Sequence, residues 1–185
     1  MDADRGGPVA PLIREIGDGD HAAIHEILMS AHVLAGSMRV PYSRLEQTRE
    51  RLVFRRGTYQ LVAEVKGQVV GFGELVTYPD EPRHRHVGEI NLVATHADWV
   101  RHGIGRAIFG ALVELGDNWL NLSRLGLIAF TGNEHAVRLY ESFGFVLEGT
   151  MRRFGYGANG WMDAHVMGRL RDYPPVTDAT PREPR

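Results

Sequence analysis

The stretch Val87–Gly105, with the sequence VGEINLVATHADWVRHGIG, decides how this chain folds. A strand-like run at residues 87–94 leads to a glycine-rich turn, RHGIGR at residues 101–106, which opens an amphipathic helical pattern. Such a turn presents unpaired backbone N–H groups at the positive end of a helix, where phosphate binds favourably. The stretch therefore predicts a ligand that carries phosphate.

Two common phosphate-binding motifs do not fit this turn. A mononucleotide P-loop continues with Gly-Lys-Ser/Thr, whereas Gly105 is followed by Arg106 and Ala107. The dinucleotide fingerprint requires a third glycine where this chain has Ile108, and Gly110 comes two residues too late. The turn indicates a phosphate ligand of another kind.

A second pattern lies at residues 131–145, TGNEHAVRLYESFGF. Asn133 is a favourable N-cap, and Gly144 is a favourable left-handed residue after a helix. The pattern predicts a short helix with one apolar face, formed by Ala136, Leu139, Tyr140 and Phe143.

Together the two patterns resemble a known family. The order strand, RHGIGR helix, strand at residues 125–130 and N-x-x-A-x-x-L-Y-x-x-x-G-F resembles the GNAT superfamily of acetyl-CoA-dependent N-acetyltransferases, over residues 61–170. The family's first motif usually reads Gln/Arg-x-x-Gly-x-Gly/Ala, but here Val100 stands three residues before Gly103 and Arg101 comes one place late. The resemblance implies that backbone amides do most of the pyrophosphate binding, and the part played by a side chain stays open.

The rest of the chain predicts an α/β (α+β) fold with a mostly antiparallel, twisted mixed sheet flanked by helices, in a single domain at residues 11–172. Residues 1–10 are expected to be flexible, and residues 173–185 to form a disordered, proline-rich tail. We expect strands at residues 12–16, 59–65, 69–77, 87–94, 125–130, 145–150 and 162–169, the last two joined as a hairpin through residues 155–160.

Two helices are expected between the strands at residues 12–16 and 59–65. The first helix carries Ile24, Ile27 and Leu28 on one face, and residues 32–39 form a loop or a broken helix. Pro41 suits the first turn of a second helix that ends near Val53.

Composition excludes several classes of function. A net charge of −2 over 185 residues provides no basic surface for nucleic acid or for an anionic membrane. No apolar run reaches the ~18 residues of a membrane span, and the N-terminus lacks the apolar core of a signal peptide, so a cytoplasmic protein is expected. The absence of cysteine excludes disulfides, thiolate metal sites and an acyl-cysteine intermediate.

The resemblance also implies an acetyl-CoA site. Tyr140 matches the tyrosine placed near the CoA sulfur as general acid, and its ordinary pKa of about 10 keeps it protonated at neutral pH. Asn133 matches the asparagine that contacts the pantetheine arm, and the thioester would contact backbone groups of Leu92 and Val93. The pyrophosphate would lie on the glycine turn, at Arg101, His102, Gly103, Ile104, Gly105 and Arg106.

The general base has two candidates. Alternation along the strand at residues 87–94 puts Glu89 and Val93 on one face and Ile90 and Leu92 on the other. A carboxylate in the middle of a central strand is costly to bury unless it is paired or faces a wet cleft. Glu89 is therefore the first candidate, acting directly or through a water, although an ordinary solvated or ion-paired carboxylate is the alternative. Glu74, in the adjacent hairpin strand, is the second.

Candidates for acceptor binding lie in two loops. Arg39 and Tyr42 precede the second helix, where this superfamily often shapes its acceptor pocket, and an arginine there could hold an acceptor carboxylate in a bidentate pair. Arg83, in the RHRH cluster at residues 83–86, is a candidate for the rim of the same site. The histidines of that cluster are spaced i,i+2 with arginines between them, which suits a solvated loop better than a metal, and no metal is predicted.

Several short segments resemble one bacterial subgroup of the superfamily, the L-amino acid N-acetyltransferases that act on L-methionine and L-phenylalanine. The matching segments are RVPY at residues 39–42, DNWL at 117–120, EGT at 148–150, NG at 159–160 and DA at 163–164. The resemblance implies direct attack on acetyl-CoA, in a ternary complex, by a small amine, a free L-amino acid with an apolar side chain.

Other functions and the assembly stay open. A protein N-terminal or lysine acetyltransferase is the alternative within the enzyme class, and a non-catalytic acetyl-CoA-binding module is the alternative outside it. Homodimers are common in the family, and Val166 is one apolar residue on the last strands that could serve such an interface.

Overall fold

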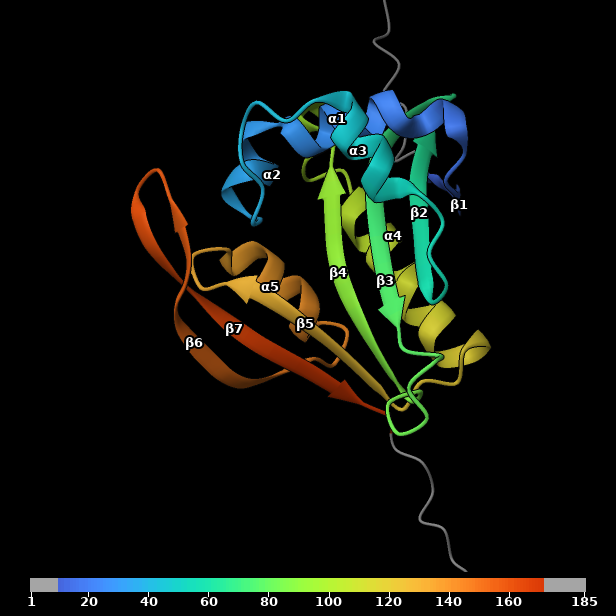
Figure 1. The fold of residues 1–185 in the computed structure, drawn as a ribbon, viewed down its shortest axis with the longest axis vertical. Coiled ribbons are helices and arrows are strands. Elements are labelled where there is room, and N and C mark those ends of the chain that lie inside the picture. The colour runs from blue at the N-terminus through green and yellow to red at the C-terminus, as the bar shows by residue number, and fades with distance from the viewer. Residues whose placement is uncertain (1–9, 172–185) are drawn as a thin grey trace, which may run out of the picture.

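The computed structural model describes residues 10–171, and its sheet consists of two halves that meet at one end (Figure 1). The strand order is β1-β2-β3-β4-β5-β7-β6. Among the described residues only β4 and β5 pair in parallel, which confirms the predicted mostly antiparallel mixed sheet. The strands are β1 Leu12–Glu15, β2 Thr58–Val65, β3 Gln68–Thr77, β4 Val87–Thr95, β5 Arg124–Phe130, β6 Val146–Gly157 and β7 Gly160–Leu170.

Helices cover both faces of the sheet. The α-helices are α1 His21–Met29, α2 Ala31–Ala35, α3 Leu45–Leu52, α4 Ile104–Glu114 and α5 Glu134–Glu141. Shorter elements are the 3₁₀ helices Asp18–Asp20 and Ala97–Trp99 and a π-helical turn, Leu115–Trp119, that continues α4. The predicted flexible N-terminus, apart from Ala10, and the predicted C-terminal tail lie outside the described residues.

Two apolar cores lie on opposite faces of the sheet, because successive strand residues point to opposite sides. The core beneath α4 contains Ile108 and Phe109, and side chains of α5 pack against it. The core beneath α1 and α3 contains Ile24, Leu28 and Phe72. The helices thus form two layers around one sheet.

The backbone of β3 is in direct contact with α4. A Cβ atom at Gly71 would lie 2.5 Å from Ile108 Cδ1, and one at Gly73 would lie 2.3 Å from Ile108 Cγ2. Only glycine permits this approach at the two positions. The close packing fixes α4, and the glycine turn at its start, against the sheet.

Two predicted boundaries need correction. The second helix begins at Leu45 rather than Pro41, because Tyr42 adopts a left-handed conformation with a φ of 67° that no helix continues through. The final hairpin is confirmed, but its strands are longer than predicted, since β6 and β7 pair as far as Gly157 and Gly160.

Alternation along β4 is broken by a β-bulge. Two consecutive residues of β3 pair with Ile90 and Leu92, so Asn91 is the extra residue. As a result Ile90 and Val93 both pack against the core beneath α4, whereas Leu92 and Ala94 pack against the other core. The prediction that Ile90 and Leu92 share a face is therefore wrong.

Candidate active site

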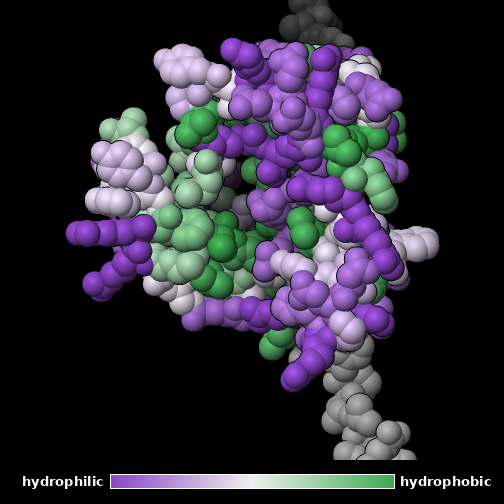
Figure 2. Space-filling view, in the orientation of Figure 1, coloured by the Kyte–Doolittle hydropathy of each residue, from purple (hydrophilic) through white to green (hydrophobic). Residues whose placement is uncertain are grey.

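A cleft opens where β4 and β5 separate. The two strands pair only through residues 87–89 and 124–126, and beyond that point they diverge (Figure 1). The cleft has a volume of about 870 Å³, and its walls are α2 with the segment after it, residues 90–95 of β4, the glycine turn and α5. Figure 2 shows a hollow here, with apolar side chains toward the β5–β7 half and hydrophilic ones over α1 and α3.

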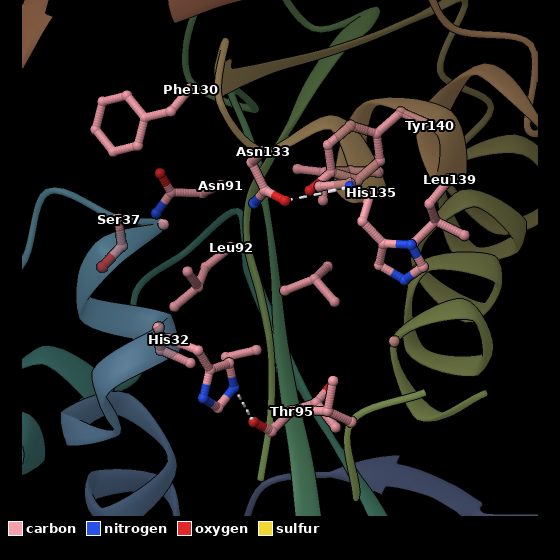
Figure 3. A pocket seen from close by; sticks show the side chains of 18 of the residues that line it. His32, Ser37, Asn91, Leu92, Thr95, Phe130, Asn133, His135, Leu139 and Tyr140 are labelled. Carbon is pink, nitrogen blue, oxygen red and sulfur yellow. Dashed lines mark hydrogen bonds between the residues drawn. The ribbon is translucent and has the colours of Figure 1, made fainter. Parts of the chain in front are cut away.

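The unpaired edge of β4 directs backbone groups into this cleft. His96 N–H donates to Val70 O at 2.8 Å, so the backbone groups of His96, and of every second residue before it, face β3. Those of Val93 and Thr95 therefore face the cleft, and Thr95 O accepts a hydrogen bond from His32 Nε2 at 2.9 Å (Figure 3). Val93 N–H is thus a donor beside the open edge.

The glycine turn forms one end of the cleft. Gly103 is the N-cap residue of α4 and has a φ of 82°, and Arg101 is also left-handed, with a φ of 68°. The first N–H groups of a helix have no partner within it, so the amides of Ile104, Gly105 and Arg106 are donors. Ile104 is only 1% exposed and does not line the cleft, whereas Gly103, Gly105 and Arg106 do.

Three side chains of the turn differ in their surroundings. Arg106 Nη2 donates to Ser142 Oγ at 3.0 Å, and its guanidinium lies 5.3 Å from the centre of the Phe143 ring. His102 Nδ1 bonds the main chain at 3.0 Å and does not line the cleft. Arg101 is exposed and lines the cleft, which leaves it the less constrained of the two arginines.

Helix α5 supplies the wall that faces α2 across the cleft (Figure 3). Asn133 Oδ1 caps the helix by accepting from Ala136 N–H at 3.3 Å, and its Nδ2 lies close to Gly36, 3.4 Å from where a Cβ atom there would be. The Tyr140 ring packs 4.8 Å from Phe109, centre to centre, and the tyrosine lines the cleft. Burial raises the pKa of Tyr140 to about 12, so its hydroxyl stays protonated at neutral pH.

The two candidate bases lie outside the cleft lining. Glu89 is exposed, and burial together with a hydrogen bond to Glu89 raises the pKa of Tyr78 to about 12. Glu74 is fully buried, and its carboxylate accepts from Arg51 Nη2 at 3.0 Å, Gln60 Nε2 at 2.7 Å and Asn91 Nδ2 at 2.5 Å. The structure thus gives Glu74 a full set of donors and leaves Glu89 near solvent.

The predicted acceptor residues are not brought together. Arg39 lines the cleft, whereas Tyr42 is 98% exposed and outside it. Arg83 is exposed in the turn before β4 and also lies outside the lining. Sequence reasoning missed Arg51 and Asn91, which both line the cleft. Asn91 carried a detectable signal, a polar residue in the middle of a largely apolar strand, whereas nothing separates Arg51 from the other charged residues of α3.

Within residues 10–171 no group of at least three His, Cys, Asp or Glu side chains could hold a metal ion. In the RHRH segment, His84 lies edge-on to Tyr78 with ring centres 4.5 Å apart. No helix in the described part of the chain has the length and apolar character needed to cross a membrane.

The diverging strands, the amide-lined turn and the tyrosine-bearing helix are the arrangement of an acyl-CoA-binding transferase. The chain belongs to the acetyltransferase (GNAT) family, whose profile matches residues 18–145, and it is an N-acetyltransferase. Members of this family use acetyl-CoA.

Named relatives agree with this assignment. The chain is 31% identical to the L-amino acid N-acetyltransferase AaaT of Escherichia coli K12 over 160 residues, covering 86% of this chain and 98% of the relative. The crystal structure of ribosomal-protein-alanine N-acetyltransferase from Brucella melitensis matches with a TM-score of 0.76 and 28% identity, covering 86% of this chain and 99% of that one. YncA from Salmonella typhimurium, determined with its cofactor acetyl-CoA, has the same fold, with a TM-score of 0.74, 22% identity and coverage of 91% and 98%.

Proposed function

We propose that the protein transfers the acetyl group of acetyl-CoA to the amine of a free L-amino acid, by direct attack in a ternary complex. The observation that carries the proposal is the cleft itself, which has α5 and the glycine turn on one side and arginines of the α2–α3 region on the other. The similarity to an L-amino acid N-acetyltransferase along most of both chains supports the choice of acceptor.

Acetyl-CoA would lie along the open edge of β4. We assign its pyrophosphate to the amides of residues 103–106, with Arg101 as the supporting cation, because free amides and the helix dipole favour a phosphate there. The pantetheine arm would run past Leu92 and Val93 toward the Asn133 amide. The thioester carbonyl would then accept from Val93 N–H, which faces the cleft.

The transfer needs three groups around the thioester. The neutral amine forms a C–N bond at the carbonyl carbon while the C–S bond breaks, and Val93 N–H stabilises the charge that develops on the oxygen. Tyr140 gives its hydroxyl proton to the departing thiolate. Since the chain has no cysteine, no thioester with the protein can form, which supports the direct route.

The amine must lose a proton before or during attack. Glu89 lies two residues before Asn91 on β4 but outside the cleft lining, so we assign it the role of receiving this proton through water rather than by contact. Glu74 is set aside as base because its carboxylate already accepts from buried donors.

A thiol-release assay on the purified protein tests the proposal. Acetyl-CoA is supplied with free L-amino acids, polyamines, aminoglycosides or short peptides. Turnover with L-phenylalanine or L-methionine supports the proposed acceptor class. Turnover with peptides alone would favour a protein N-terminal or lysine acetyltransferase. The similarity to a ribosomal-protein-alanine N-acetyltransferase also suggests this alternative. CoA binding without turnover of any amine would indicate a binding module. The homodimer and the cytoplasmic location stay predictions.

A further inference from the structure

A cluster of charges around one buried carboxylate adjoins the acceptor side of the cleft. At its centre is Glu74, whose side chain is 0% exposed. Arg51 Nη2 lies 3.0 Å from one oxygen of this carboxylate and Arg55 Nη2 lies 3.6 Å from the other. A third guanidinium, Arg39, is close enough for both Arg51 and Glu74 to act on its charge. Two guanidiniums therefore pair with one buried carboxylate, and the charge of a third lies near them.

Two of these arginines line the cleft and keep unused donors. Arg39 and Arg51 line it, whereas Arg55 does not. Arg51 Nε is buried and has no hydrogen-bond partner among the described residues. The guanidinium of Arg39 likewise has no hydrogen-bond acceptor within residues 10–171. Burial, and then the charge of Arg51, lower the pKa of Arg39 to about 10, so the group is still charged at neutral pH.

An anion would stabilise the guanidiniums of Arg39 and Arg51. Buried donors without acceptors and like charges held together are both unfavourable, and a carboxylate placed between two guanidiniums relieves both conditions. The position is suited to the acceptor, because Asn91 links Glu74 to the edge of β4 next to Leu92 and Val93. In an α-amino acid one carbon separates the carboxylate from the amine that must reach this edge.

We propose that Arg39 and Arg51 bind the carboxylate of the amino-acid acceptor, and that Glu74 is a positioning residue that orients Arg51 toward it. The inference rests on the proposed function and narrows it, because the protein would require a negative group beside the reacting amine. Amines without a carboxylate, such as polyamines, would be poor acceptors.

Calorimetric binding to the CoA-saturated protein tests this site. The two probes are L-phenylalanine and L-phenylalaninamide, which share the side chain and differ in the carboxylate. We expect the acid to bind about 10- to 100-fold more tightly than the amide, the range of a charge-assisted bidentate contact. The two probes also differ at their amines. This difference cancels when the ratio of the two dissociation constants is compared between protein variants.

Single substitutions then locate the effect. Arg39→Gln and Arg51→Gln should each bring the ratio of the two dissociation constants close to one and leave amide binding unchanged. Arg55→Gln is the matched control, since it removes the same charge from the same carboxylate outside the cleft, and it should keep the ratio. Glu74→Gln should lower the ratio without changing the affinity for CoA, whereas a purely structural role would weaken acid, amide and CoA alike.

Several results would overturn the inference. These are equal binding of acid and amide by the unchanged protein, no binding of either, an equal loss for both probes in Arg39→Gln, or an Arg55→Gln effect as large as that of Arg39→Gln. Thiol release separates the two proposals. Tight acid binding without turnover would refute the proposed acetyl transfer and support the carboxylate site. Turnover of acid and amide at equal rates would support acetyl transfer and refute the carboxylate site.

Discussion

The two sides of the cleft are built in different ways. The proposed cofactor side consists of the glycine turn and α5, which offer backbone amides and a packed tyrosine, and each part comes from one short continuous segment. The proposed acceptor side consists of Arg39, Arg51 and Asn91, which come from three separate segments. Glu74, on a fourth, accepts hydrogen bonds from Arg51 and Asn91, and its charge acts on Arg39.

This difference has a physical basis. Backbone donors require only a local conformation, so a phosphate site made of backbone amides can be encoded in a few consecutive residues. Charged side chains require partners that hold and neutralise them, and those partners come from distant parts of the chain. We expect single local substitutions to impair the cofactor side, whereas the acceptor side should be impaired by the loss of a partner that several of its residues share.

The largest effect is expected for Gly105→Glu on the cofactor side. The helix dipole tolerates a glutamate in the first turn, so the fold should persist, but the carboxylate would repel the phosphates and raise the Kd for acetyl-CoA about 10³-fold. Gly110→Ala in the same helix is the control, because its Cβ would lie 3.5 Å from Phe143, an ordinary contact. Equal CoA affinities in both variants by calorimetry would contradict the assignment.

On the acceptor side, Glu74→Gln should reduce the free energy of unfolding by about 3 kcal/mol, because it removes the counter-charge of the partly buried Arg51 guanidinium and leaves a fully buried amide with one acceptor oxygen fewer for three donors. Urea unfolding measures this loss. Glu64→Gln is the control: its carboxylate pairs with Arg14 at 2.9 Å but is 24% exposed. A pair of this kind contributes less than about 1 kcal/mol. Similar losses in the two variants would mean that Glu74 is not the centre of a buried network.

Tyr140→Phe should lower kcat about 100-fold and leave the KM for acetyl-CoA within a factor of about three, because the ring contact with Phe109 is kept and only the proton donor is lost. The pH profile gives a second measurement. Since the pKa of Tyr140 is raised to about 12, the acid form persists as pH increases, and kcat of the unchanged enzyme should show no fall between neutral pH and pH values near the ordinary tyrosine pKa of about 10. An unchanged kcat in Tyr140→Phe would remove the tyrosine from the chemistry.

The smallest effect is expected for Glu89→Gln. A base that acts through water is replaced in part by solvent, so kcat/KM should fall only about tenfold at neutral pH, with less loss at higher pH where more amine is already neutral. Glu134→Gln, an exposed carboxylate paired with Arg138 at 3.1 Å, is the control for a change of surface charge. Steady-state rates that match those of the control would exclude Glu89 as the base.

Local signals predicted most of the fold. Alternating apolar residues placed the strands of the β2–β3 hairpin, and Asn133 with Gly144 marked the ends of the α5 region. The prediction failed at Pro41, where a favourable helix start was overruled by the left-handed backbone at Tyr42, and at Asn91, where a bulge shifted the alternation. A bulge depends on the pairing of two strands, and a single strand's pattern does not contain it.

The sequence by itself determined the family and predicted a cofactor side, because glycines, a cap and an apolar face act through neighbours in the chain. The sequence also predicted Arg39 beside the acceptor, but only the tertiary structure placed Arg51 and Glu74 near it. Arg51 carries no distinguishing signal and Glu74 was predicted as a base, and they form a pair because Arg51 Nη2 lies 3.0 Å from the buried Glu74 carboxylate. Packing of α3 against the sheet makes that pair, and ionic interactions become selective only where water is excluded.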